Sequence, residues 1–560
     1  MLALDHPPSL SEFAYAALAI ALIAGVLILS LFFFHRFRSR VFPPERDDTG
    51  RPNIVKSVAF GKRRRLVVIR RGDAEHVVMI GGPNDVVIET ILDDNKRHES
   101  CESDWDWLQE AAPDKAHAGG KRSYLERAKR IIGAGGLMPL ALLSCASGAG
   151  AGAICGLFRL ALEKADRFRD AIPLHWQDEP VLGCGLLIAG AATAAALSAF
   201  LVRQYKIHAA GSGIPQVEAA IQDDLPPAPF ILLPLKFFGG LLAIGAGLAL
   251  GREGPCVQMG ATISHFIGRA FRRSIGDCRA LLAAGAGAGL AAAFDAPLAG
   301  SAFVLEELLR RFETRNAVAA LGASGSAIVI TRLITGSAPD FAVSAISDPA
   351  LGDNLLCFLL GGVAGLIGVI YNRVLFGALA LADGLSRWPT EARAAFIGAA
   401  AGALAWFAPG LAGGGDDLTQ RTLDGTYALV LIPFIFALRL ILGAASYAAG
   451  TPGGLFAPLL ALGAQIGFLF GGLVDLGQAG PATHAAAFAV VGMAALFTAV
   501  VRAPLTGMIL VTEMTANSIL LLPMLAACFS AMAVATMFGE PPVYDALRER
   551  TVALWRKKAD

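Results

Sequence analysis

Runs of about 20 apolar residues, repeated from residue 136 almost to the C-terminus, limit the fold of this chain more than any other feature. A run of that length is what an α-helix needs to cross a bilayer. Of the 560 residues, 55% are hydrophobic and 17% are charged, whereas a soluble domain has about 25% charged residues. The sequence therefore predicts an all-α, multi-pass membrane protein. The clearest predicted spans are 137–160, 181–202, 230–250, 355–381, 428–449 and 519–537.

The residues ahead of these runs divide into three regions. Residues 1–40 contain one apolar span, 11–34, followed by the basic sequence HRFRSR, which predicts a retained membrane anchor with its C-terminal side in the cytoplasm. Residues 41–91 contain three β-branched runs separated by RRGD and GGPND turns, which predict a small cytoplasmic antiparallel β unit. Residues 92–122 carry both signs of charge and are expected to form a disordered linker. Residues 123–560 form the transport-like body.

This body contains an internal repeat. FDAPLAGSAFVLEE (Phe294–Glu307) matches VRAPLTGMILVTEM (Val501–Met514), and the two prolines lie 504 − 297 = 207 residues apart. A glycine-rich interruption precedes each copy. Matching interrupted helices in two halves are typical of inverted-repeat transporters, whose site lies between the halves. We therefore expect halves of roughly 123–340 and 341–560.

Four glycine-rich interruptions need a common explanation. They are GSGIP (211–215), GREGP (251–255), GGLFAP (453–458) and GEPPVY (539–544). The first three are each predicted to open a helix after a glycine, with proline near its first turn. Helix N-termini present unpaired N–H groups and a partial positive charge, and glycine lets the backbone approach closely. Several such N-termini would form an anion site without a fully buried cation.

The candidate donors in this site are the backbone at Leu455 and Phe456 and the hydroxyls of Ser212 and Tyr544. The alternative is that the glycines only allow helices to pack closely, as small residues do in many membrane proteins. The residues expected to support the site are Gly211, Gly213, Pro215, Gly251, Arg252, Gly254, Pro255 and Gly454.

Glu253, within GREGP, is an acidic residue at bilayer depth, where charge is costly and usually functional. Its ionised carboxylate would compete with an anion for the same donors, and its protonated form would leave them. Burial favours the neutral form and the donors favour the ionised form, so titration at accessible pH is expected. The alternative is an ion pair with Arg252, although adjacent helical positions do not face each other.

A proton pathway needs a second acidic residue. Glu306 matches Glu513 in the repeat, so both are candidates for structural roles, whereas Glu307 matches Met514. An unpaired carboxylate at the end of an apolar helix suggests that Glu307 transfers protons. A solvated charge at the helix end is the alternative.

The motifs GSGIPQVE, GREGP, AAAFDAPLAG, TPGGLFAPLLALG, VRAPLTGMILVTEMT and PPVY, in this order between residues 123 and 555, resemble the CLC family of chloride channels and chloride/proton exchangers. The resemblance implies a homodimer in which each subunit has its own ion pathway. It also implies chloride binding by Ser212, Leu455, Phe456 and Tyr544, an external gate at Glu253 and internal proton transfer at Glu307.

Two positions refine what this resemblance implies. Serine at position 212 implies chloride rather than nitrate, because the nitrate-preferring plant relatives carry proline there. Asp295 stands where asparagine is usual in related sequences. An additional carboxylate at that position would alter proton access or form a local ion pair, and the sequence leaves both open.

We therefore expect a chloride/proton antiporter in a bacterial-type inner membrane, with a cytoplasmic C-terminus and surrounding lipid. No enzyme activity, cofactor, metal or nucleic-acid partner is expected. One alternative is an uncoupled chloride channel gated by Glu253. Another is a structural component of a flagellar or secretion apparatus, because residues 1–90 resemble a small single-pass flagellar export-apparatus protein of the FliO type.

Overall fold

The computed structural model divides the chain into two units, Ala24–Ser123 and a larger one formed by Met1–Ile23 with Tyr124–Asp560. The predicted anchor at 11–34 and the linker at 92–122 lie outside the described residues, except that Leu92 ends a strand. The described residues are 53–60, 64–71, 74–80, 86–92 and 137–559, with gaps at 338, 344–350, 386 and 478–483.

The smaller unit contains an antiparallel sheet in the order β1-β2-β3-β4. The sequence analysis identified three β-branched runs here, and the structure describes one further strand ahead of them. This strand, NIVKSVAF, pairs along most of β2, from Asn53 opposite Arg70 to Phe60 opposite Arg64. The strands are β1 (Asn53–Phe60), β2 (Arg64–Arg71), β3 (Ala74–Ile80) and β4 (Val86–Leu92).

The described part of the larger unit is mainly helical, and the interrupted helices fall where the glycine motifs are. Its elements up to residue 335 are α3 (Leu137–His175), α4 (Pro180–Val202), η2 (Arg203–Tyr205), α5 (Lys206–Ala209), α6 (Ile214–Ile221), α7 (Leu232–Gly245), α8 (Glu253–Ala270), α9 (Ile275–Phe294), α10 (Pro297–Phe303), η3 (Val304–Leu308) and α11 (Thr314–Thr335).

The remaining elements are α12 (Leu351–Gly384), α13 (Thr390–Phe407), η4 (Pro409–Leu411), α14 (Asp416–Leu423), η5 (Leu429–Leu431), α15 (Ile432–Ala448), α16 (Phe456–Gly477), α17 (His484–Val501), α18 (Pro504–Thr515), α19 (Leu521–Met537) and α20 (Val543–Ala559). Among the described residues, seven helices are long and apolar enough to cross a membrane. The prediction of a multi-pass helical membrane protein is therefore confirmed.

One predicted span is shorter than expected. The apolar run 230–250 forms a helix only over α7, Leu232–Gly245, which has 14 residues. The chain then turns at Gly247, whose φ of 92° is open to glycine without strain, and runs without regular structure towards Gly251. The apolar residues after Gly247 therefore lead into the interrupted segment instead of extending the helix.

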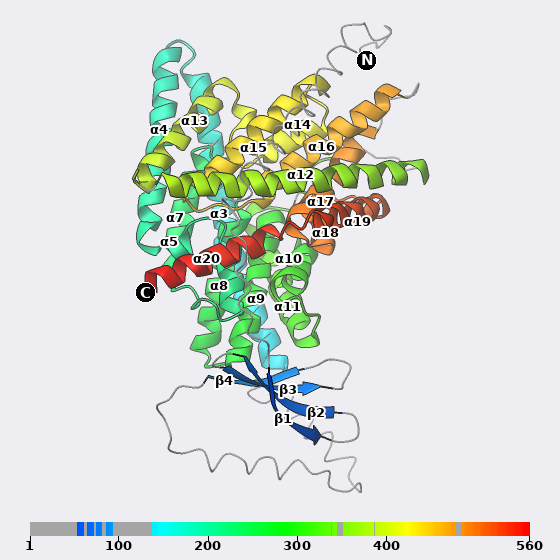
Figure 1. Cartoon of the computed structure of the whole chain (residues 1–560). Helices are drawn as coiled ribbons and strands as arrows, with labels where there is room; N and C mark the ends of the chain where they lie inside the picture. The colour runs from blue at the N-terminus through cyan, green and yellow to red at the C-terminus, as the bar shows by residue number, and fades with distance from the viewer. Residues whose placement is uncertain are drawn as a thin grey trace. The chain divides into compact units, whose positions relative to one another are not determined.

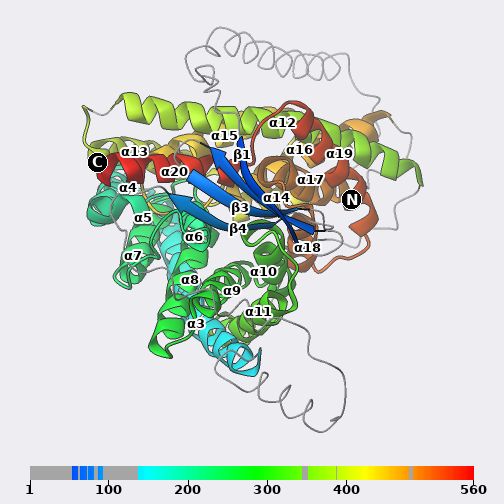
Figure 2. The same ribbon diagram turned by 60° about the horizontal axis from the view of Figure 1, so that its bottom comes forward.

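The helices before and after residue 340 occupy different sides of the larger unit. In both views the cyan and green helices gather on one side, and the yellow and orange helices gather on the other (Figures 1 and 2). The two groups pack together where α4 contacts α13 and α10 contacts α18. The red C-terminal helix α20 crosses back and packs against α6, which brings its first residues to the middle of the unit.

The two copies of the repeat cap each other through their matched glutamates. The backbone N–H groups of Leu298 and Ala299, at the start of α10, donate to the Glu513 carboxylate at 3.1 and 2.8 Å. Reciprocally, the backbone N–H groups of Leu505 and Thr506, at the start of α18, donate to Glu306 at 3.0 and 2.7 Å. Carboxylates at helix N-termini satisfy free donors and complement the helix dipole. Both glutamates therefore have structural roles.

Candidate functional site: a buried carboxylate among interrupted helices

Backbone hydrogen bonds join three of the four glycine-rich interruptions. The Gly211 N–H donates to the Thr451 carbonyl at 3.0 Å, and the Gly453 N–H donates to the Gly211 carbonyl at 3.2 Å. Gly251 and Gly454 exchange two bonds of 2.9 and 2.7 Å. These bonds span more than 200 residues of sequence, so the loops that start α6, α8 and α16 form one connected structure.

Each of these loops leads into a helix as the motifs predict. α6 begins at Ile214, α8 at Glu253 and α16 at Phe456, and a proline lies within the first turn of each helix. The predicted helix starts are therefore confirmed. Gly213, immediately before α6, has a φ of 94°, in the left-handed region that favours glycine.

The carboxylate of Glu253 lies at the N-terminus of α16. The backbone N–H of Phe456 donates to Glu253 Oε1 at 2.6 Å, and the glutamate is fully buried. Glu253 Oε2 has no hydrogen-bond partner among the described residues. An anionic group therefore occupies the free donors of a helix start, where such groups are stabilised.

The glycines around this carboxylate are sterically required. A Cβ on Gly251 or on Gly454 would overlap the Glu253 carboxylate itself. A Cβ on Gly254 would overlap the backbone carbonyl of Ser212. Only glycine therefore lets the carboxylate and the backbone of neighbouring loops meet at these distances.

Gly454→Ala is expected to destabilise the protein by about 1–3 kcal/mol, the usual cost of overpacking a buried site. The matched control is Gly443→Ala in α15, where an added Cβ meets nothing within 4 Å. Thermal unfolding in detergent compares the two variants with the unmodified protein. Because the overlap involves the Glu253 carboxylate, Glu253→Ala should recover part of the loss in the Gly454→Ala background. An equal effect of the two glycine variants contradicts this steric account.

Two buried hydroxyls belong to the same region. Ser212 and Tyr544 are both fully buried, and apart from the approach of the two hydroxyls to each other, neither oxygen has a hydrogen-bond partner among the described residues. The Tyr544 hydroxyl lies near the Ser212 hydroxyl and the Glu253 carboxylate. The Tyr544 ring also contacts the Phe456 ring, with centroids 5.7 Å apart. Buried polar groups usually have a partner, so hydroxyls in this arrangement are suited to bind a polar ligand.

Phe456 sits in an aromatic cluster, whereas Leu455 precedes α16 and is 2% exposed. The Phe456 ring makes an edge contact with Phe497 at 4.7 Å between centroids and with Phe303 at 5.8 Å. The structure therefore brings Ser212, Phe456, Tyr544 and Glu253 close together. Leu455 lies immediately before the first residue of α16, Phe456.

Two supporting residues were missed in the sequence analysis. Lys236 of α7 is fully buried, and its Nζ donates to the Gly211 carbonyl at 2.8 Å. The Ser212 N–H donates to the Tyr447 hydroxyl of α15 at 3.4 Å. A lysine inside an apolar run was a signal that could have been used, because intramembrane charge is rarely without a role. Tyr447 gave no comparable signal.

Arg252 does not neutralise Glu253. Its Nε donates to the Ala293 carbonyl at 2.9 Å, and its guanidinium pairs with Asp340 at 3.4 Å and with Asp416 at 3.3 Å. Within the described part of the chain, no ion pair joins Arg252 to Glu253. The local ion-pair alternative for Glu253 is therefore wrong.

Glu307 lies in η3, a single π-helical turn that follows α10. It is 3% exposed, which rules out the solvated helix-end charge. Its nearest charged partner is Arg310, 3.8 Å away. Arg310 also pairs with Asp545 at 2.7 Å and lies 3.7 Å from Glu218. Arg310 thus connects Glu307 and Glu218 with Asp545, the residue after Tyr544. The sequence analysis did not identify this arginine.

Asp295 forms a local ion pair. Its carboxylate accepts two bonds from Arg332 Nε, at 3.0 and 3.2 Å, and one from Nη2, at 3.0 Å. Asp295 ends α9 with a φ of 51°, a left-handed conformation that aspartate and asparagine tolerate better than most residues. Of the two possibilities left open by the sequence, the structure contains the ion pair.

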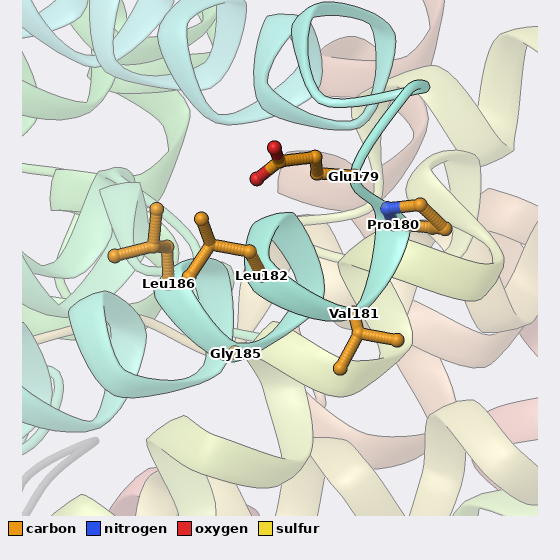
Figure 3. Close-up of a pocket in the computed structure, with 6 residues that line it drawn as sticks. All are labelled: Glu179, Pro180, Val181, Leu182, Gly185 and Leu186. Atoms are coloured by element: carbon orange, nitrogen blue, oxygen red, sulfur yellow. The ribbon is translucent and has the colours of Figure 1, made fainter.

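The hollow drawn in Figure 3 is separate from this cluster. It lies at the start of α4 and is lined by apolar side chains such as Val181, which is 87% exposed. Its only acidic lining residue is Glu179. Among the residues that the structure describes, no group of three His, Cys, Asp or Glu side chains could hold a metal ion.

The fold and the cluster together define a class: a multi-pass membrane protein in which interrupted helices meet around a buried carboxylate. Residues 194–536 match the family model described as "Voltage gated chloride channel". The chain belongs to this family, the CLC family, so the resemblance seen in the motifs is confirmed.

Relatives and solved structures agree with this assignment. The chain is 38% identical over 430 residues to the H(+)/Cl(-) exchange transporter ClcA of Cronobacter sakazakii, covering 74% of this chain and 91% of that protein. It is 39% identical over 362 residues to ClcA of Vibrio parahaemolyticus, covering 63% and 77%. A slow cyanobacterial Cl-/H+ antiporter matches with a TM-score of 0.70 and 31% identity, covering 74% of this chain and 98% of that structure.

Proposed function

We propose that this protein exchanges chloride for protons across the membrane, with Glu253 as the group that both gates the anion and carries the proton. Support comes from the relatives named as H(+)/Cl(-) exchange transporters. The observation that carries the proposal is the hydrogen bond from the Phe456 N–H to the Glu253 carboxylate. In this geometry the carboxylate takes the position that a bound anion would need.

In the proposed cycle, chloride replaces the Glu253 carboxylate at the start of α16. The backbone N–H groups at Leu455 and Phe456 and the hydroxyls of Ser212 and Tyr544 are its donors. Apart from their approach to each other, the two hydroxyls have no partner among the described residues, which supports this assignment. Chloride suits the site because helix-end dipoles stabilise an anion without a buried counter-cation.

In the proposed cycle the proton moves across the membrane in the direction opposite to chloride. Protonation of Glu253 removes its charge and weakens its bond to the Phe456 N–H, so the side chain leaves and chloride enters. Glu307 exchanges the same proton with the internal solution. Glu307 is buried and lies near Arg310, which also lies near Glu218. This environment supports a role in proton transfer rather than that of a solvent-exposed charge.

We also propose the domain assignment, the membrane topology and the oligomeric state, which family membership and the charge distribution support. We assign residues 1–40 to a membrane anchor, 41–91 to a small cytoplasmic β unit, 92–122 to a linker and 123–560 to the transport domain. The basic sequence after the apolar span favours a cytoplasmic β unit, in a bacterial-type inner membrane. We also assign a cytoplasmic C-terminus and a homodimer surrounded by lipid.

Reconstituted liposomes test the exchange itself. A chloride gradient is imposed without a proton gradient, and the internal pH is recorded. The proposal predicts uphill proton movement driven by chloride flux. Chloride flux with no proton movement would instead support the second candidate, an uncoupled chloride channel. The burial of Glu307 favours the exchanger, because a channel needs no second proton-transfer carboxylate.

A further inference from the structure

The chain between α11 and α12 is attached to two elements of the second half, α14 and α18. Among its described residues, 336–337 and 339–343, the Phe341 N–H donates to the Met514 carbonyl of α18 at 3.0 Å, and Phe341 is 3% exposed. Ala342 exchanges two bonds of 2.9 Å with the Gln420 side chain of α14. These contacts hold the preceding residue, Asp340, in a fixed place.

Asp340 is a buried acid between two arginines. Its side chain is 5% exposed and pairs with Arg159 of α3 and, at 3.4 Å, with Arg252. Each arginine side chain is 13% exposed. Their other acidic partners are more accessible: Glu163 is 37% exposed and Asp416 is 47% exposed. Asp340 is therefore the most deeply buried acid in this group.

Arg252 connects this group to the gate. It immediately precedes Glu253, and its Nε holds the Ala293 carbonyl in the last turn of α9. Asp340 and Asp416 bind its Nη atoms, and within the described residues no ion pair joins the guanidinium to the Glu253 carboxylate. The direction of Arg252 therefore depends on acids that are distant in the sequence.

We propose that Asp340 is a positioning residue for the Glu253 gate, acting through Arg252 and through the charge balance beside it. The inference rests on the proposed function of Glu253. Among the described residues, the other ionisable groups around Glu253 include Asp416, the phenols of Tyr371 and Tyr544, and Lys236, which donates to the Gly211 carbonyl of the adjoining loop. Phenols are neutral near pH 7 and Lys236 is the same in every variant of the test, so the charges that the variants change are those of the two arginines and their acids.

The sign of the effect follows from this charge balance. Loss of the Asp340 charge leaves an excess positive charge near Glu253, which favours the ionised carboxylate and keeps the gate in place. A lower pH is then needed to protonate Glu253 and release its side chain. Loss of the Arg159 charge has the opposite effect.

The test measures chloride flux from liposomes against pH. In Asp340→Asn, we expect the pH of half-maximal flux to fall by on the order of half to one unit. In Arg159→Gln we expect it to rise, and in the charge-balanced double variant we expect it to return towards the unmodified value. The control Asp417→Asn removes an acid of α14 that is 61% exposed and paired with Arg421, and it should cause no shift.

The opposite shifts separate positioning of the gate from general stabilisation, because a purely structural role would not reverse sign. Arg159→Gln keeps the test available if Asp340→Asn does not fold. An unchanged midpoint in both variants, or shifts in the same direction, overturns the role of Asp340. Absence of pH-dependent flux in the unmodified protein contradicts the proposed function of Glu253, and the inference with it.

Discussion

Glu253→Gln is expected to reduce chloride-driven proton movement to the level of protein-free liposomes while chloride flux continues. Glutamine has nearly the same shape but carries neither a titratable proton nor a negative charge. Glutamine therefore cannot carry protons, and it does not compete with chloride for the Phe456 N–H as a carboxylate does. Chloride flux should also become independent of pH.

Paired recordings of chloride and proton flux across a pH series measure this effect. Glu513→Gln is a matched control, because Glu513 accepts backbone hydrogen bonds at the start of α10 and is far in sequence from the gate. We expect that control to lose about 0.5–2 kcal/mol of stability, as helix-cap variants do, and to keep proton coupling. Proton movement of normal size in Glu253→Gln contradicts the gate assignment.

Glu307→Gln should also abolish proton movement, but it should leave chloride flux dependent on pH. The reason is that Glu253 would still titrate from the external side, whereas the internal route to it would lack its carboxylate. This difference distinguishes the two glutamates: loss of coupling is common to both variants, and loss of pH dependence belongs to Glu253→Gln alone.

The adjacent residue provides the control for Glu307. Glu306 accepts the backbone N–H groups at the start of α18, so Glu306→Gln should lower stability without uncoupling transport. The same flux recordings and thermal unfolding curves compare the pair. Retained proton coupling in Glu307→Gln, or its loss in Glu306→Gln with the fold intact, would contradict the separation of roles drawn from the repeat.

Local sequence patterns were sufficient for several parts of the site. The helix starts at Ile214, Glu253 and Phe456 follow from glycine and proline chemistry, which acts within a few residues. The comparison of the two repeat copies separated Glu306 from Glu307 and made Glu306 a candidate for a structural role, and in the structure Glu306 caps the start of α18.

Contacts between segments that are distant in the sequence could not be predicted in this way. The bonds between Gly251 and Gly454, and the contact of Asp340 with Arg252, join segments that lie far apart in the chain. No periodicity or motif encodes these pairings, because they depend on how two helical layers pack. Asp295 is an intermediate case: the sequence marked it as unusual, but only packing brought Arg332 to it.

A crystal structure with bromide in place of chloride tests the central claim most directly. The account holds that the Glu253 carboxylate occupies an anion site at the start of α16. In Glu253→Gln, an anomalous bromide peak should lie within hydrogen-bond distance of the Phe456 nitrogen, and in the unmodified protein at neutral pH the carboxylate should remain there instead. Bromide bound at that nitrogen beside an undisplaced Glu253, or no bromide there in the variant, would contradict it.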